Sequence, residues 1–524
     1  MQQNRIKFFI LLSLSFIFIN RGNCFEQENI KGNRPNIIFL LTDDQRDNTF
    51  SIDGHPFVKT PNIDKLIKNG VRFSNAYIAE PTCSPSRVSL FTGMHERING
   101  VGFSSSYQLT EEQWAKTYPA LLQKNGYYTG FIGKFGVEYY TFKESVAEKF
   151  DYWKAHNGWA RFFPKQVKNC QIYADVKENI ITPIMGEIME DFLDSIPSNQ
   201  PFCLSVSFSV PHGSQTRSMF PGNKQAEAMK IPANENPKLK NHPFYDTLYR
   251  NITIDIPKET ATNPYQYIPK NVLNQQKGRA NQTYVYNYDT LTNREHHIRY
   301  YQQISGLDKI IGDLVKSLKN RGLDKTTVLI FASDHGLLMG EYGMGGKALL
   351  YDLTSKIPCF VFDPNLNSRL RSRIVENLVS SLDITSLILD YAGVEAPPEM
   401  EGKSLKPLIY QEKTKWRDEI FLENLYTGRD NPFSEGVRSG NWKYIRMFTG
   451  IQPYSENDVD FSNRKPDFEQ LFNLKTDPAE MINLIDKMEG TALLNDFRKK
   501  CQEYSTQLNK NRENYQTTHK SITR

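Results

Sequence analysis

The sequence predicts an α/β fold built on a sheet whose strands are buried on both faces. Two observations support this prediction: apolar runs of strand length recur along the chain, and a longer segment repeats apolar residues at helical spacing. The four runs are Asn36–Thr42, Tyr128–Ile132, Phe202–Val210 and Thr327–Ala332. Continuous apolar runs of this length are typical of parallel strands covered on both faces.

A long helix is predicted before the fourth run. Between Asn293 and Arg321 the apolar residues would form one buried stripe; they are Ile304, Leu307, Ile311, Leu314 and Leu318. Ahead of this helix, residues 213–292 are rich in Asn, Gln, Tyr and Pro and show weak periodicity. Because long irregular segments often form binding loops or lids, this insertion is predicted to shape the substrate pocket. An inert surface excursion is the alternative.

Charged residues and imidazoles follow the apolar runs. They are Asp43 with Asp44, Lys134, His212, and Asp334 with His335. In open α/β sheets, ligand sites lie just outside the carboxyl ends of the strands, so the topology predicts that these residues converge on one crevice. Taken one at a time, acidic residues after strands are equally well explained as turn residues or helix caps.

The acidic residues of this set are suited to a metal ion. If Asp43, Asp44 and Asp334 meet, they supply hard carboxylate oxygens, and His335 adds an imidazole. Oxygen-rich ligation of this kind suits Ca²⁺ or Mg²⁺ rather than zinc. Standing alone, Asp334-His335 would more often be a hydrogen-bonded strand end than a pair of ligands.

The most specific stretch is Cys83-Ser84-Pro85-Ser86-Arg87. Pro85 suits the first turn of a helix, where unpaired N–H groups and the positive end of the helix would face the Cys83 thiol. Arg87 follows four residues later, on the same side of such a helix, and its guanidinium can hold an oxyanion or an oxidised cysteine derivative. A structural cysteine at a helix start is the alternative that the short pattern leaves open.

The longer string, which continues through Leu90-Phe91-Thr92-Gly93, resembles the signature of the formylglycine-dependent (type I) sulfatases of the alkaline phosphatase superfamily. In that family the cysteine is converted enzymatically to formylglycine. Three further segments are similar to the amino-terminal half of a sulfatase, in the right order: Thr42–Gln45, Val58–Asp64 and Gly70–Phe73. The resemblance implies an alkaline-phosphatase-like α/β fold, with a large mixed sheet flanked by helices and a smaller C-terminal antiparallel-sheet subdomain.

The resemblance also implies roles for individual residues. The implied ligands of Ca²⁺ are Asp43, Asp44, Cys83 in its modified form, Asp334 and His335. The implied catalytic set consists of Cys83, Arg87, Lys134, His212 and Lys347. In the implied mechanism, one hydroxyl of the hydrated aldehyde at position 83 attacks sulfur and expels the alcohol, and the second hydroxyl then releases sulfate. Cations are expected around the sulfate because negative charge spreads over its oxygens during transfer.

The implied activity is the removal of sulfate from a sulfated saccharide or polysaccharide. The implied partners are this substrate and the formylglycine-generating maturation enzyme, which reads Pro85 and Arg87. Two alternatives stay open: a phosphatase or phosphonate hydrolase of the same superfamily, and a non-catalytic homologue that binds sulfated glycans. A net charge of +5 over 524 residues, without a basic block, argues against nucleic-acid binding.

Three regions are predicted along the chain. Residues 1–24 are predicted to be a signal peptide, because Arg5 and Lys7 precede an apolar run that is too short to span a bilayer. Residues 25–395 would form the catalytic domain and residues 396–524 the C-terminal subdomain. Because of this signal, the protein is expected to be extracytoplasmic, either secreted or periplasmic. No other transmembrane candidate is predicted. Cys24 could carry a lipid anchor, but the residues before it do not resemble a lipobox.

Within the C-terminal region, Glu435–Arg446 is predicted to form two short strands around a turn at Gly440-Asn441. A closing helix is implied by the resemblance. The polar residues from Asn509 onward predict a frayed end.

One residue departs from the family pattern. Many sulfatases carry a histidine two residues after the lysine, whereas here Lys134-Phe135 is followed by Gly136. Glycine can neither donate a proton nor bond through a side chain. We therefore expect leaving-group protonation to fall to His212 or Lys347, and we expect Gly136 to open room for a bulkier sugar.

Overall fold

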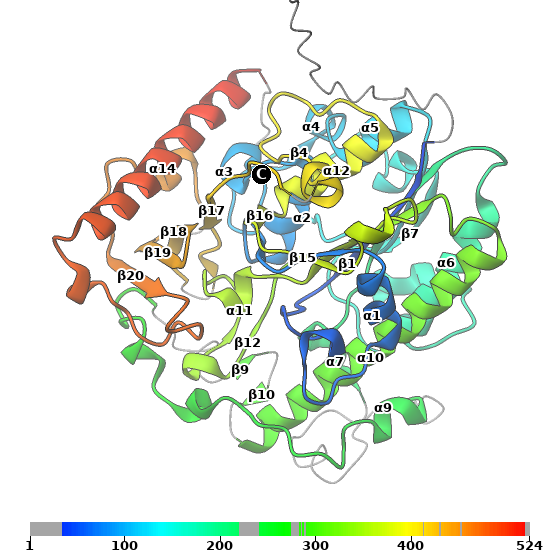
Figure 1. Cartoon of the computed structure of the whole chain (residues 1–524), viewed down its shortest axis with the longest axis horizontal. Helices are drawn as coiled ribbons and strands as arrows, with labels where there is room; N and C mark the ends of the chain where they lie inside the picture. Colours follow the sequence, from blue (N-terminus) through cyan, green and yellow to red (C-terminus); the bar gives the residue numbers. More distant parts are fainter. Residues whose placement is uncertain are drawn as a thin grey trace, which may run out of the picture. The chain divides into compact units, whose positions relative to one another are not determined.

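The computed structural model describes residues 34–219, 240–273, 282–283, 286–287, 290–411, 413–428, 431–450 and 453–518. Its largest sheet has the strand order β15-β2-β14-β11-β1-β8-β5-β7 (Figure 1). Strands β11, β1, β8, β5 and β7 are parallel, whereas β14 is antiparallel to both of its neighbours. The prediction of a large mixed sheet is therefore confirmed. The strand bounds are β1 (Asn36–Thr42), β2 (Val71–Phe73), β5 (Tyr128–Lys134), β7 (Tyr152–His156), β8 (Phe202–Ser207), β11 (Thr327–Ser333), β14 (Cys359–Phe362) and β15 (Arg373–Val375).

Strand β1 lies inside this sheet, between β11 and β8, and all of its residues are buried. Its side chains alternate between two cores: Ile37, Phe39 and Leu41 lie in one, and Ile38 and Leu40 lie in the other. Successive residues of a strand point to opposite faces, so an uninterrupted apolar run is what a strand covered on both faces requires. All four predicted strands are present, although β8 ends three residues earlier than predicted, at Ser207.

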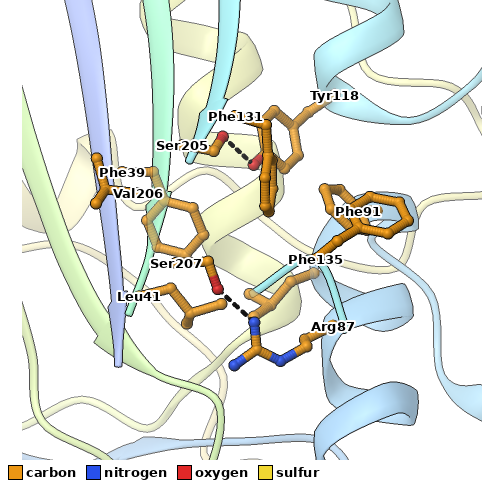
Figure 2. Close-up of a pocket in the computed structure, with 11 residues that line it drawn as sticks. Phe39, Leu41, Arg87, Phe91, Tyr118, Phe131, Phe135, Ser205, Val206 and Ser207 are labelled. Carbon is orange, nitrogen blue, oxygen red and sulfur yellow. Dashed lines mark hydrogen bonds between the residues drawn. The ribbon is translucent and has the colours of Figure 1, made fainter. Parts of the chain in front are cut away.

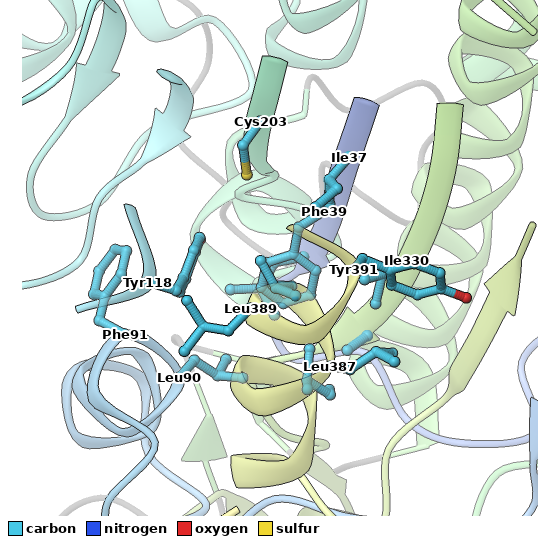
Figure 3. Close-up of a cluster of buried hydrophobic side chains, with 14 of the residues drawn as sticks. Ile37, Phe39, Leu90, Phe91, Tyr118, Cys203, Ile330, Leu387, Leu389 and Tyr391 are labelled. Carbon is cyan, nitrogen blue, oxygen red and sulfur yellow. The ribbon is translucent and has the colours of Figure 1, made fainter. Parts of the chain in front are cut away.

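Helices cover both faces of the sheet. On one face lie α6 (Ile181–Ser195) and α10 (Thr290–Asn320), and the predicted apolar stripe of α10 packs there, through Leu307, Ile311 and Leu314. The other face is covered by α2 (Cys83–Thr92), α5 (Tyr118–Lys124) and α12 (Leu382–Ala392). Figure 3 shows Leu387 and Leu389 of α12 in the same cluster as Phe39 of β1.

A second, smaller sheet has four antiparallel strands, β17 (Glu419–Asn424), β18 (Phe433–Ser439), β19 (Trp442–Phe448) and β20 (Phe468–Asn473). Strands β18 and β19 form the predicted hairpin around Gly440-Asn441, which confirms the antiparallel subdomain. The sheet packs against α14 (Ala492–Thr518). The expected fraying was wrong for residues 509–518, because α14 continues to Thr518 and buries Tyr515 in the core that it shares with this sheet; residues 519–524 lie outside the described part of the chain.

The other helices and strands are short. They are α1 (Pro61–Lys68), β3 (Ala76–Tyr77), α3 (Glu96–Asn99), β4 (Leu109–Thr110), α4 (Glu111–Trp114), β6 (Tyr140–Thr141), α7 (Gly213–Ser218), α9 (Pro243–Thr247), β9 (Gln282–Thr283), β10 (Tyr286–Asn287), β12 (Leu338–Met339), β13 (Gly345–Gly346), α11 (Asp352–Ser355), β16 (Val379–Ser380) and α13 (Lys406–Tyr410). The predicted signal peptide and Cys24 lie outside the described residues, and the predicted insertion at 213–292 is described only in part. Among the described helices, none combines the length and the apolar character needed to cross a membrane.

Candidate active site

The carboxyl ends of β1, β5, β8 and β11 meet at one edge of the large sheet, because these strands are parallel and in register. Backbone hydrogen bonds lock the segments that leave them: Asp43 donates to Val210 and Asp334 donates to Thr42. The predicted polar residues at the strand ends are therefore brought together. They are Asp43, Asp44, Lys134, His212, Asp334 and His335, and all are buried.

Cys83 is the first residue of α2, with Thr82 at the N-cap, so its thiol lies at the positive end of the helix. Its Sγ accepts a hydrogen bond from Nζ of Lys347 over 2.7 Å and lies 3.3 Å from Nε2 of His335. The thiol also points to Oδ1 of Asp43, 3.7 Å away. The described structure therefore places the predicted nucleophile among the predicted ligands.

Arg87, one turn further along α2, holds neighbouring residues of the site in place. Its Nη2 and Nε donate to Oδ2 of Asp334 over 2.8 and 3.1 Å, and its Nη1 donates to the carbonyl of Lys134 over 2.9 Å. A further bond from Nη1 reaches Ser207 (Figure 2). Behind the guanidinium lies a small cavity of about 20 Å³, whose largely apolar wall includes Phe135. Arg87 therefore fixes one face of the site.

Two lysines neutralise the carboxylates that directly follow β1. Lys134 donates to Oδ2 of Asp43 and Lys347 donates to Oδ1 of Asp44, each over 2.7 Å. Burial raises the pKa of Asp43, but the charges of Lys134, Arg87 and Lys347 outweigh it and hold that pKa well below its usual range. The site thus keeps ionised carboxylates beside ammonium groups, which is the environment that an anionic substrate and a cation would share.

His212 is the N-cap of α7. Its Nδ1 accepts a hydrogen bond from the backbone N–H of Ser214 over 3.1 Å, and its Nε2 lies 3.7 Å from Oδ2 of Asp44. Burial lowers the pKa of His212 to about 4. At neutral pH the ring is therefore neutral, and since Nδ1 is an acceptor, the remaining proton is on Nε2 and faces the site.

The acidic cluster fits a hard divalent cation. One ligand atom each from Asp43, Cys83, Asp334 and His335 lies within 4.8 Å of the others, and Asp44 belongs to an overlapping group. Oδ2 of Asp44 is buried and accepts no hydrogen bond from the described residues. The backbone of Asp44 is in the left-handed region, with a φ of 66°, a strained conformation of the kind found at functional sites. These features favour oxygen ligation of a metal.

His156 lies beside the site and was not predicted from the sequence. It ends β7 and pairs with Lys134 at the end of β5. Its Nδ1 lies 2.7 Å from the hydroxyl of Tyr173 and its Nε2 lies 3.4 Å from Oγ of Ser209. Burial, and then the charges of Lys134 and Arg87, lower the pKa of His156 to about 3, so its ring is neutral. The short segment Tyr152–His156 contains a lysine and is not an apolar run, which is why no strand was predicted there.

The expectation that Gly136 opens room for a sugar was wrong. Gly136 is buried and has a φ of 72°. A Cβ at this position would overlap Cδ of Arg87 and lie 2.9 Å from its Nε. The space beside Gly136 is therefore filled by Arg87, and a histidine here would displace the residue that holds Asp334.

Comparisons with known proteins agree with this geometry. The family model described as Sulfatase matches residues 35–394, and the model described as N-sulphoglucosamine sulphohydrolase, C-terminal, matches residues 340–507. The chain is 26% identical over 506 residues to an arylsulfatase of Clostridium perfringens, covering 89% of this chain and 93% of the relative. It is 25% identical over 516 residues to an N-acetylglucosamine-6-O-sulfatase of Bacteroides thetaiotaomicron, covering 91% of this chain and 87% of the relative.

A solved structure shows the same fold. It is a protein in complex with its substrate D-glucosamine-2-N,6-O-disulfate, and it is similar to this chain with a TM-score of 0.64, 23% identity, and coverage of 91% of this chain and 99% of that chain. The sulfatase model spans well over half of the sequence. The chain therefore belongs to the formylglycine-dependent sulfatase family of the alkaline phosphatase superfamily and is a sulfuric ester hydrolase.

Proposed function

We propose that this sulfatase removes sulfate from a sulfated saccharide outside the cytoplasm, with a formylglycine made from Cys83 as its nucleophile. The observation that carries the proposal is the position of Cys83 at the start of α2, with its Sγ 2.7 Å from Nζ of Lys347 and 3.3 Å from Nε2 of His335. The names of the relatives, which include a sulfatase of N-acetylglucosamine, support a saccharide substrate.

The residues around Cys83 also support its conversion to formylglycine. Pro85 and Arg87 stand where the modifying enzyme of the family reads them, so the active protein is proposed to carry an aldehyde at position 83. When hydrated, the aldehyde would supply one hydroxyl to displace the alcohol from sulfur and a second to release the sulfate. A serine or an unmodified cysteine would be a poor substitute, because its covalent adduct would need direct hydrolysis.

The proposed cofactor is Ca²⁺, held by the side chains of Asp43, Asp44, Asp334 and His335 together with the oxygen of the modified residue. The buried Oδ2 of Asp44, which accepts no hydrogen bond among the described residues, supports this assignment. When bound, Ca²⁺ would polarise the sulfate and favour an ionised nucleophile.

The remaining residues would bind the sulfate and move the proton. Lys134 and Lys347 present ammonium groups beside Asp43 and Asp44, where they can donate to sulfate oxygens as negative charge develops. Of the two proton donors expected from the sequence, Lys347 is favoured, because a neutral imidazole N–H is a far weaker acid than an ammonium group. His212 would then donate a hydrogen bond from Nε2 without giving up its proton.

Three measurements test this proposal. Peptide mass spectrometry of purified active protein should find an aldehyde at position 83, and an ordinary thiol in fully active protein would refute the nucleophile. Release of inorganic sulfate should occur from members of a panel of sulfated oligosaccharides and should be lost in Cys83→Ala. Rates on 4-nitrophenyl sulfate and 4-nitrophenyl phosphate should favour the sulfate; a higher rate on the phosphate would support the phosphatase alternative, and binding without turnover would support the glycan-binding one.

A further inference from the structure

The loop that follows β7 presents an exposed aromatic ring. Trp159 is 62% exposed, the largest fraction among the large apolar side chains that the structure describes. Single exposed apolar residues are common on protein surfaces, and a tryptophan alone would carry no inference. Two further observations support a role for Trp159: the exposed side chain of Arg161 and the hydrogen bonds that hold the loop.

Arg161 lies beside it. The side chain of Arg161 is exposed and makes no hydrogen bond or ion pair with any residue described in the structure. Ala160, between Trp159 and Arg161, is fully buried. The order exposed, buried, exposed along three residues places the indole and the guanidinium on the solvent side of the loop, two residues apart.

The loop is tied directly to the active site. The carbonyl of Ala160 accepts hydrogen bonds from Oγ of Ser214 over 2.9 Å and from Nε2 of Gln215 over 2.6 Å. The same Oγ of Ser214 lies 2.8 Å from Nδ1 of His212. The residue between Trp159 and Arg161 is therefore separated from the imidazole of His212 by a single hydroxyl group.

The other end of the loop is also held. Asn169 donates through Nδ2 to the carbonyl of Asn157 and, over 3.4 Å, to the carbonyl of Trp159. The loop leaves β7 at His156, which pairs with Lys134 at the active-site edge of the sheet. Trp159 and Arg161 thus belong to an anchored loop that leaves β7 at the active-site edge of the sheet and is hydrogen-bonded to the segment that carries His212.

We infer that Trp159 and Arg161 form a subsite for a second, anionic sugar unit of the glycan that carries the scissile sulfate. The flat indole offers an apolar face on which the C–H face of a pyranose ring can stack. The guanidinium matches the geometry of a carboxylate or sulfate group on the same ring. This inference rests on the proposed function, since it takes the chain to be a glycan sulfatase, and it adds which part of the glycan is recognised.

Kinetics on substrates of different size test the subsite. The substrates are a heparin-derived tetrasaccharide, which bears carboxylates and sulfates, a κ-carrageenan tetrasaccharide, which bears sulfates only, and 4-nitrophenyl sulfate, which has no second sugar. Trp159→Ala and Arg161→Ala should each raise KM for the tetrasaccharide that is cleaved by about tenfold, the loss expected for a removed binding anchor. The rise for 4-nitrophenyl sulfate should be several times smaller.

Conservative and remote variants serve as controls. Trp159→Phe keeps an aromatic face and should recover most of the affinity, and Arg161→Lys should recover part of it. Strand β15 lies at the opposite edge of the sheet from β7. On that side Ile374 is 60% exposed and Arg369 is exposed, so Ile374→Ala and Arg369→Ala remove comparable exposed groups and should leave KM unchanged.

Calorimetric binding separates the subsite from the proposed function. One outcome is that the wild-type protein binds a tetrasaccharide, that Trp159→Ala weakens this binding about tenfold, and that no sulfate ester is hydrolysed. This outcome would support the subsite and refute the proposed function. If sulfate is released but both variants bind and cleave the tetrasaccharides as the wild type does, the subsite is refuted. Equal losses on 4-nitrophenyl sulfate and on the tetrasaccharide would also refute it, because they would indicate a structural role of the loop.

Discussion

His156 and Lys134 are paired across neighbouring parallel strands, each at the carboxyl end of its strand, and the imidazole of His156 also reaches Oγ of Ser209. Ser209 lies three residues before His212. Strand pairing therefore places His156 next to Lys134, and the contact with Ser209 joins its neutral, buried ring to the segment that carries His212.

We predict that His156→Ala lowers kcat on 4-nitrophenyl sulfate by about ten- to a hundredfold, because small displacements of positioned groups have effects of this size. KM should change less. His156→Gln, which keeps a neutral hydrogen-bonding group, should retain more activity than the alanine variant. Equal kcat for wild type and His156→Ala would show that His156 has no part in positioning the site.

A second prediction concerns Gly136. Gly136→Ala should lower activity on small and large sulfate esters alike, because its Cβ would displace Arg87 from Asp334. Gly54 is the matched control: its φ of 81° is similarly left-handed, but a Cβ there would meet nothing within 4 Å. Backbone strain should cost each variant about 1–2 kcal/mol of unfolding free energy, and Gly136→Ala should lose more because its Cβ also displaces Arg87. Only Gly136→Ala should lose activity, as measured by initial rates; equal activity of the two variants would contradict the contact with Arg87.

Metal binding should stabilise the fold. The carboxylates of Asp43, Asp44 and Asp334 lie around one site. Cationic side chains offset part of their mutual repulsion, and a bound metal ion would offset more of it. Ca²⁺ at a hundred times its Kd should add about 2.7 kcal/mol to the unfolding free energy, and a chelator should lower Tm by a corresponding amount. In Asp44→Asn the Ca²⁺-dependent shift in Tm should shrink, whereas exposed Asp175→Asn should keep it. If Ca²⁺ does not change the Tm of the wild type, these carboxylates do not share an ion.

The role of Lys347 as proton donor predicts a dependence on the leaving group. The alcohol of a sugar sulfate needs a proton to leave, whereas the phenolate of 4-nitrophenyl sulfate leaves without one. Lys347→Ala should therefore slow the cleavage of a sugar sulfate about tenfold more than the cleavage of 4-nitrophenyl sulfate. General acids contribute on the order of 10²–10⁴-fold to the rate. His212→Gln should slow both substrates by similar factors. If His212→Gln shows the leaving-group dependence instead, the proton comes from His212.

The pair of His95 and Glu401 predicts a pH dependence of stability. Nδ1 of His95 lies 2.7 Å from Oε2 of Glu401. Burial lowers the pKa of His95, but the carboxylates of Glu401, Glu423 and Glu80 outweigh it and raise that pKa to about 10. A raised pKa means that the folded state binds the proton more tightly, so its contribution is complete below about pH 6.5 and is lost as the pH rises toward 10.

We therefore expect Glu401→Gln to lower Tm most at pH 6 and progressively less between pH 6.5 and 10. Thermal melts of both proteins across this range measure the difference. A difference in Tm that stays constant over the range would show that the pair does not carry the predicted charge.

Local patterns in the sequence were enough for much of the fold and of the candidate site. The apolar run Asn36–Thr42 predicts a strand buried on both faces because each of its residues must face a core. Ile304 and Leu307 predict a helix because their spacing matches its period. Cys83 and Arg87 are four residues apart and therefore lie on the same side of one helix, so the arrangement of thiol and guanidinium follows from short-range geometry and can be predicted without the tertiary structure.

Contacts between distant segments were decided only by the tertiary structure. The pairing of His156 with Lys134 depends on the register of β7 against β5. No apolar run in the sequence predicts β7 or this register. The close approach of Arg87 to Gly136 depends on how the segment after β5 packs against α2. Ala160, the neighbour of Trp159, is joined to His212 through the hydroxyl of Ser214, more than fifty residues away in sequence. Local propensity encodes which elements form, whereas side-chain packing and strand register determine which residues meet.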